Sequence, residues 1–170
     1  MMQPFHFFFV VLASSPDAYA KLDTLDSIRP PPQDSLDYEG RDLYYRVKRP
    51  RIDEKRVPLP AHPLTWTTIA YVLWDDIDPD VFSLDQRKAM LDWLHWGGRL
   101  IVSGPRSLEK LRGSFLEPYL PVQGASNNKL DQASFQEINE FWSIGPVRPG
   151  TQLKIVEGQP LEGLRFELAE

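Results

Sequence analysis

The sequence predicts an α/β fold: a mostly parallel sheet with helices on both of its faces. Two observations lead to this prediction. Residues 69–74 and 100–102 are apolar runs without polar alternation, which is typical of strands buried on both faces. The segment between them has the pattern of one amphipathic helix, so we expect two parallel strands joined by a right-handed crossover.

The crossover helix has a start signal and a stop signal. Ser83 is followed three residues later by Gln86, which is the capping-box pattern of a helix N-terminus. Apolar residues then recur at helical spacing and form one face: Ala89, Met90, Trp93, Leu94 and Trp96. Gly97 and Gly98 end the helix, because glycine enters the left-handed conformation at little cost.

The first apolar run, residues 5–12, predicts an opening strand. It also resembles the apolar core of a secretory signal, with residues 18–20 as the cleavage pattern. We favour the strand, because no Lys or Arg precedes Lys21. A helix should follow, with Ser15 as its cap and Pro16 in its first turn. Its apolar stripe would consist of Ala18, Leu22, Leu25 and Ile28.

Shorter signals predict the remaining elements. Before the crossover we expect a strand at 43–47 and an extended edge segment or loop at 57–63. After it we expect a helix from about Arg106, with Gly104 or Ser107 near its cap, and then a turn at 117–121 and a loop at Asn127 and Asn128. The last expected elements are strands at 152–156 and 164–168, preceded by an amphipathic helix whose apolar residues are Phe135, Ile138, Phe141 and Trp142. We therefore expect one domain over residues 1–170, with its core in 5–121 and an extension in 122–170.

Composition excludes several classes of function. The chain of 170 residues is 42% hydrophobic and 25% charged, which is typical of a globular protein. A net charge of −5 argues against nucleic acid as a main partner. The absence of cysteine removes disulfides, thiolate metal ligands and a cysteine nucleophile. No apolar run is long enough to span a bilayer, and no cofactor is predicted.

The five tryptophans divide into two groups. Trp74 and Trp93 lie at predicted core positions. The other three are either core residues or parts of an exposed aromatic surface for a partner: Trp66, Trp96 and Trp142.

An acidic cluster follows the strand at 69–74 and consists of Asp75, Asp76, Asp78 and Asp80. Three of these carboxylates fall at alternate positions, as in a calcium-binding loop. However, Val81 occupies the position of the loop glycine and Arg87 that of the bidentate glutamate. We therefore favour a polar turn in which the aspartates accept hydrogen bonds from backbone amides.

Ser103 is the best-placed nucleophile, because it ends a strand at the sheet edge where α/β proteins bind ligands. A serine nucleophile needs a base, and the histidines are His6, His62 and His95. Only His62 lies in a predicted loop from which it could approach Ser103. The nucleophile-elbow pattern with glycine two residues before the serine is absent.

The pattern from Trp74 to Pro105 resembles the class I glutamine amidotransferase-like domain. It has a strand ending in aspartate, a Ser-x-x-Gln helix start, Gly-Gly and the run Arg-Leu-Ile-Val-Ser-Gly. More narrowly, it is similar to the non-catalytic versions within large membrane-associated bacterial proteins of unassigned function. The resemblance covers residues 5–121 and implies a flavodoxin-like, three-layer fold. Active members carry a cysteine after the strand that corresponds to 100–102, whereas this chain has Ser103, so their glutaminase activity is not implied.

The expected function is therefore that of a non-catalytic domain that binds a ligand or a protein partner, as part of a longer protein. The resemblance implies an extracytoplasmic or membrane-associated parent, and other domains of that parent as partners. The expected ligand contacts all lie at strand carboxyl ends: Ser14, Ser15, Asp75, Asp76, Ser103, Gly104 and Arg106. The alternative is a hydrolase that uses Ser103 or a metal held by Asp75, Asp76 and Asp78.

Overall fold

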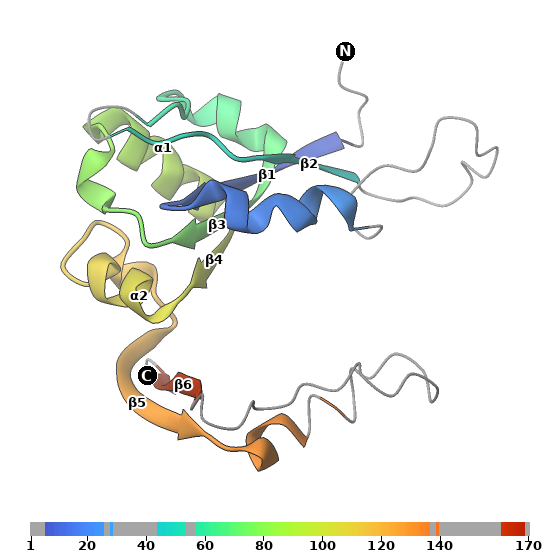
Figure 1. The fold of residues 1–170 in the computed structure, drawn as a ribbon. Coiled ribbons are helices and arrows are strands. Elements are labelled where there is room, and N and C mark those ends of the chain that lie inside the picture. Colours follow the sequence, from blue (N-terminus) through green and yellow to red (C-terminus); the bar gives the residue numbers. More distant parts are fainter. Residues whose placement is uncertain are drawn as a thin grey trace. The chain divides into compact units, whose positions relative to one another are not determined.

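The computed structural model describes residues 6–25, 28, 44–53, 57–136, 139 and 161–168 (Figure 1). The chain divides into two compact units, Met1–Pro118 and Tyr119–Glu170. In the described residues the first unit has a parallel sheet combined with helices, and the second has an antiparallel pair of strands. The prediction of an α/β fold is confirmed at this level.

The parallel sheet contains the two apolar runs as neighbouring strands. Its strands in the described part of the chain are β1 (His6–Ala13), β2 (Tyr44–Lys48), β3 (Ile69–Asp75) and β4 (Arg99–Ser103), in the order β2-β1-β3-β4. β3 pairs with β4 in parallel, with Val72 opposite Leu100 and Trp74 opposite Val102. The predicted parallel pairing and the predicted opening and second strands are therefore confirmed.

The two central strands are buried on both faces, as their sequences predicted. Residues 9–13 of β1 and 72–74 of β3 are all buried. One face carries a core cluster of Phe9, Val11, Ala13 and Leu73. The second apolar run, residues 100–102 in β4, is not buried on both faces, because Ile101 is 40% exposed. β4 is the last strand in the order of the described sheet, so it pairs with a neighbouring strand on one side only.

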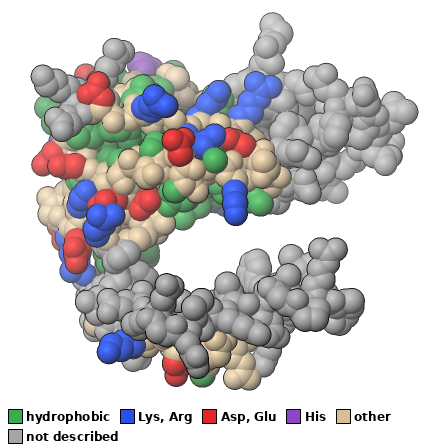
Figure 2. Space-filling view, viewed as in Figure 1, with side chains coloured by type: hydrophobic (Ala, Val, Ile, Leu, Met, Phe, Trp, Pro, Cys, Tyr) green, Lys and Arg blue, Asp and Glu red, His purple; other side chains and the backbone are tan. Residues whose placement is uncertain are grey.

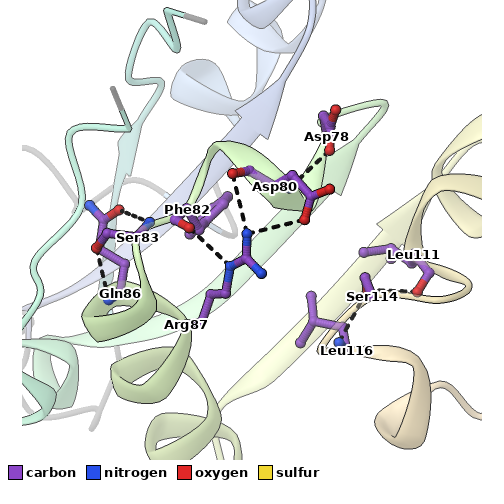
Figure 3. A network of polar contacts seen from close by, with 9 residues as sticks. All are labelled: Asp78, Asp80, Phe82, Ser83, Gln86, Arg87, Leu111, Ser114 and Leu116. Carbon is purple, nitrogen blue, oxygen red and sulfur yellow. Dashed lines mark hydrogen bonds and ion pairs between the residues drawn. The ribbon is translucent and has the colours of Figure 1, made fainter. Parts of the chain in front are cut away.

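The crossover helix α1 (Leu84–His95) has the predicted capping box (Figure 3). The Gln86 amide donates to Ser83 Oγ at 3.2 Å, and the Ser83 amide donates to Gln86 Oε1 at 3.1 Å. The Gln86 side chain also donates to the carbonyl oxygens of Val57 and Leu59, at 2.8 and 2.7 Å. One side chain thus fixes both the helix start and the proline-rich segment before η2 (Pro63–Thr68).

The segment after β1 differs from its prediction. It forms a 3-10 helix, η1 (Pro16–Thr24), in which the Ser15 side chain makes no capping hydrogen bond. A 3-10 helix has three residues per turn, so Tyr19 and Leu22 share the side that packs on the β1–β3 cluster. The predicted stripe assumed the period of an α-helix, and its members Ala18 and Leu25 are exposed.

Three of the tryptophans form core anchors. Trp66 and Trp74 are fully buried, Trp93 is 2% exposed, and the rings of Trp66 and Trp93 lie 5.6 Å apart. Trp96, in contrast, is 56% exposed at the end of α1. Trp142 lies outside the described residues.

The helix predicted from about Arg106 is present, and the segments predicted as turns at 78–80 and 117–121 contain single 3-10 turns. These elements are η3 (Pro79–Val81), α2 (Pro105–Leu111) with Gly104 as its N-cap, and η4 (Glu117–Tyr119). No described helix is long and apolar enough to cross a membrane.

The second unit pairs β5 (Val122–Leu130) with β6 (Leu161–Leu168) in antiparallel register. The predicted strand at 164–168 is confirmed within β6. The predicted loop at Asn127 and Asn128 is wrong, because both lie in β5; ladder pairing with β6 outweighs the low strand propensity of asparagine. Phe135 ends a 3-10 turn, η5 (Gln132–Phe135), while Ile138, Phe141, Trp142 and the strand predicted at 152–156 lie outside the described residues.

Candidate functional site

The carboxyl ends of three parallel strands meet at one edge of the sheet. The amide of Ser14 after β1 donates to the Asp75 carbonyl at 3.1 Å, and Asp75 pairs with Ser103 in the β3–β4 register. The turn into α2 then adds Gly104 and Arg106. This carboxyl edge carries all of the predicted ligand contacts: Ser14, Ser15, Asp75, Asp76, Ser103, Gly104 and Arg106.

Tyr19 reaches this edge from η1 and joins two of its side chains. Its hydroxyl lies 3.0 Å from Asp75 Oδ2 and 3.1 Å from Ser103 Oγ. A phenol has one proton, so when Tyr19 donates to the carboxylate its oxygen accepts from Ser103. Burial chiefly raises the Tyr19 pKa above its ordinary value of 10.0; the Ser103 hydrogen bond works against this rise and the Asp75 carboxylate adds to it. Tyr19 therefore stays protonated at neutral pH.

Asp76 adopts an unusual backbone conformation with φ 58°. Aspartate enters this left-handed region more readily than most residues, because its short side chain bonds locally. The Asp76 amide donates to Ser107 Oγ at 2.7 Å, and the Ser107 hydroxyl donates to the Ser103 carbonyl. Ser107 is fully buried, so it joins the ends of β3 and β4 from inside.

Two cations of α2 hold the Asp76 carboxylate. Lys110 Nζ lies 2.7 Å from Oδ1, and an Arg106 guanidinium nitrogen lies 3.0 Å from Oδ2. The Lys110 hydrogen bond chiefly lowers the pKa of Asp76 below its ordinary value of 3.8; burial opposes this shift, and both cationic charges favour it. The Asp76 side chain is 11% exposed and that of Arg106 is 75% exposed. Arg106 therefore keeps donors that face solvent.

Asp76→Asn is expected to destabilise the protein at neutral pH, with an effect that fades in acid. Because the folded-state pKa of Asp76 lies below its ordinary value of 3.8, the ionised group contributes its full stability above that value. The contribution is lost as the pH falls through the lowered pKa. Urea unfolding of wild type and variant across this range measures the difference. Glu109→Gln, an exposed change on α2, is the control and should show no such convergence.

Gly104 is required where β4 turns into α2. Its φ of 80° is left-handed, and an added Cβ would lie 3.2 Å from Asp75 Oδ1. A side chain here would therefore strain the backbone and crowd the carboxylate that Tyr19 contacts.

The acidic turn does not gather its carboxylates around one point. Asp78 Oδ1 accepts from the Asp80 amide at 2.9 Å, and the Asp80 carboxylate pairs with Arg87 at 3.1 Å (Figure 3). In the described part of the chain no three His, Asp or Glu side chains converge as metal ligands would. Asp78 thus accepts a backbone amide, as predicted. The alternative metal site of Asp75, Asp76 and Asp78 is not formed by this geometry.

The hydrolase alternative needs a base beside Ser103. Ser103 Oγ makes its side-chain hydrogen bond with the Tyr19 hydroxyl, at 3.1 Å. His62 has a different role: its Nδ1 accepts from the Leu64 amide at 3.3 Å and caps η2. In the described part of the chain Ser103 Oγ therefore has a tyrosine hydroxyl, and not His62, as its hydrogen-bond partner.

Sequence reasoning found the polar ends of the strands but missed Tyr19 and the bridging role of Ser107. The spacing of three residues between Pro16, Tyr19 and Leu22 could have indicated a 3-10 helix with Tyr19 on its packed side. Ser107 carried no such signal, because its partners lie in other segments.

Comparison with known proteins provides no relative to guide interpretation of this edge. No protein-family model matches the chain, and the searches of curated proteins and of solved structures give no match.

Proposed function

We propose that the chain is a non-catalytic domain that binds a ligand or a protein partner within a larger protein. Its proposed class is the glutamine amidotransferase-like domain with a three-layer, flavodoxin-like arrangement. The strand order β2-β1-β3-β4 supports this class, because it equals the first four strands of the flavodoxin-like order. Contacts on both faces of the sheet also support it. Leu22 of η1 packs on one face, and Trp74 stacks on Phe82 at the start of the crossover.

The proposed binding site is the carboxyl edge described above. In open α/β sheets a ligand binds where the strand order reverses, which here is between β1 and β3. Ser14 and Ser15 are exposed at this point, and the Ser15 side chain is not used as a helix cap. Arg106 adds an exposed cation. These groups suit a polar ligand, or a polar segment of a partner, that carries a carboxylate.

The proposal that the domain is non-catalytic depends chiefly on one observation, the hydrogen bond between Tyr19 and Ser103. A general base must accept the serine proton at neutral pH. Tyr19 is protonated there, because its pKa is raised. The neighbour of the serine is therefore a positioning group and not a base.

Enzymatic assays test the absence of catalysis. The complete chain and its Ser103→Ala variant are assayed for ammonia release from L-glutamine and for hydrolysis of p-nitrophenyl acetate. We expect both proteins to give the rate of buffer alone. Turnover by the wild type that disappears in Ser103→Ala would overturn the proposal in favour of the hydrolase.

Binding at the carboxyl edge is tested by NMR with L-glutamine as the probe, because it carries a carboxylate and a polar side chain. We expect saturable shifts of the amides of Ser14, Ser15 and Gly104. Arg106→Gln should weaken binding about tenfold, the size of one charge-assisted hydrogen bond. Lys88→Gln, which removes an exposed cation of α1, is the matched control. Binding that is absent, or that Arg106→Gln leaves unchanged, contradicts this site.

A further inference from the structure

A hollow lies at the opposite edge of the sheet, at the amino ends of the strands. It has a volume of about 360 Å³, and the segment where α1 ends and β4 begins contributes to its lining. Its lining comes from four strands, α1 and η2, and includes Phe7, Tyr45, Thr67, Tyr71, Trp96 and Arg99. Small-molecule sites commonly measure about 300–1,000 Å³, so the hollow could hold a ligand of one or two rings. None of the carboxyl-edge contacts takes part in it.

We propose that this amino-edge hollow binds a planar aromatic molecule with one carboxylate, which stacks on Trp96 and pairs with Arg99. The inference does not depend on the function proposed for the carboxyl edge. It rests on the packed aromatic rings, on the exposed Trp96 and on the guanidinium of Arg99.

Several aromatic rings that line the hollow are held in place by other contacts. Trp93 is buried, and its Nε1 donates to the Ile69 carbonyl at 2.7 Å. Tyr71 stacks on Phe9 with ring centroids 5.5 Å apart and meets the edge of Tyr45 at 5.3 Å. Rings held by such contacts lose little further freedom when a flat molecule packs against them.

Trp96 follows the last residue of α1 and contributes to the same hollow. It is 56% exposed, whereas Trp93 three residues earlier is buried. A large aromatic side chain exposed beside a preformed hollow is the usual platform for stacking a ligand ring. The space beside the neighbouring Gly97 is open, because a Cβ added there would meet no atom within 4 Å.

The guanidinium of Arg99 supplies the positive charge that favours an acidic ligand over a neutral or cationic one. One of its guanidinium nitrogens donates to the Tyr71 hydroxyl at 2.6 Å, and the guanidinium lies 5.4 Å from the Tyr71 ring centroid. These contacts orient the group and use one of its five donors. No acidic side chain pairs with Arg99 within the described residues. A carboxylate would accept two parallel hydrogen bonds from it, whereas a cationic ligand would be repelled.

Two probes with the same ring system test the proposal on the complete chain. Isothermal titration calorimetry measures the affinity of 2-naphthoate and of 2-naphthalenemethanol, and NMR follows the indole signal of Trp96 and the amides of Gly98 and Arg99. We expect 2-naphthoate to bind at least about tenfold more tightly than the alcohol, as a charged hydrogen bond predicts. The shifts should be confined to the hollow.

Variants identify the two contacts. Arg99→Gln and Trp96→Ala should each weaken 2-naphthoate binding about tenfold. Leu84→Ala is the control for Trp96→Ala, because Leu84 is 82% exposed at the other end of α1, and Arg51→Gln is the control for Arg99→Gln. Equal affinity for acid and alcohol, unchanged binding by Trp96→Ala, or shifts at the carboxyl edge would each overturn the proposal. The comparison of the two probes uses wild-type protein, so it holds even if a variant fails to fold.

Discussion

Gly98→Ala is expected to lower the free energy of unfolding by about 3 kcal/mol, at the upper end of overpacking effects. A Cβ at this position would lie 2.1 Å from Trp93 Cε2 and 2.2 Å from Cδ2. The Trp93 ring cannot move away easily, because it is buried against Trp66 and hydrogen-bonded to the Ile69 carbonyl. The extra methyl group must therefore displace the helix end or the ring.

Gly97→Ala is the matched comparison. The φ of Gly97 is +93°, so alanine is strained there, but its Cβ would meet nothing within 4 Å. We expect a loss of about 1–2 kcal/mol from the left-handed conformation alone. Urea unfolding followed by tryptophan fluorescence measures both variants. A loss for Gly97→Ala that equals or exceeds that for Gly98→Ala would show that the close packing of Trp93 on Gly98 is wrong.

The two glycines show what the sequence could predict and what it could not. The pair marks the end of α1 in the sequence, because glycine is favoured at a helix C-terminus. The structure assigns that conformational role to Gly97 and a packing role to Gly98. The second role depends on where the Trp93 ring lies, which local patterns do not contain.

The same limit applies at the carboxyl edge. Apolar runs and parallel order were enough to place the polar strand ends together. Tyr19 was missed because the segment after β1 turns with a period of three residues, and helical spacing of 3.6 places it on the wrong side. Ser107 was predicted only as a possible cap. Its bond to the Asp76 amide spans 31 positions of the sequence and exists only after β3 and α2 have packed.

The amino-edge hollow could not be predicted from the sequence, because six separate elements line it. Trp96 could be a core residue or an exposed one by its helical spacing. Only the structure shows that Trp93 takes the core position, whereas Trp96 is exposed and lines the same hollow as Arg99.

Trp74→Ala is expected to lower the free energy of unfolding by about 4 kcal/mol, as large-to-small changes of buried aromatic residues do. Trp74 is fully buried, stacks on Phe82 at 5.2 Å and donates from Nε1 to the Ile77 carbonyl at 3.1 Å. Removal of the ring leaves a cavity and an unpaired carbonyl. Trp96→Ala, in which the lost ring is 56% exposed, should change the same free energy by less than about 1 kcal/mol.

Trp74→Phe separates packing from hydrogen bonding. It keeps an aromatic ring against Phe82 but leaves the Ile77 carbonyl without its indole donor, so we expect a loss of about 2 kcal/mol. The register connects this residue to the carboxyl edge, because Trp74 lies between Leu12 and Val102 and directly precedes Asp75. Trp74→Ala should therefore also shift the NMR signals of Ser14 and Ser103, whereas Trp96→Ala should not. If Trp74→Ala costs no more than Trp96→Ala, Trp74 is not the anchor that holds β3 and the Asp75 network in place.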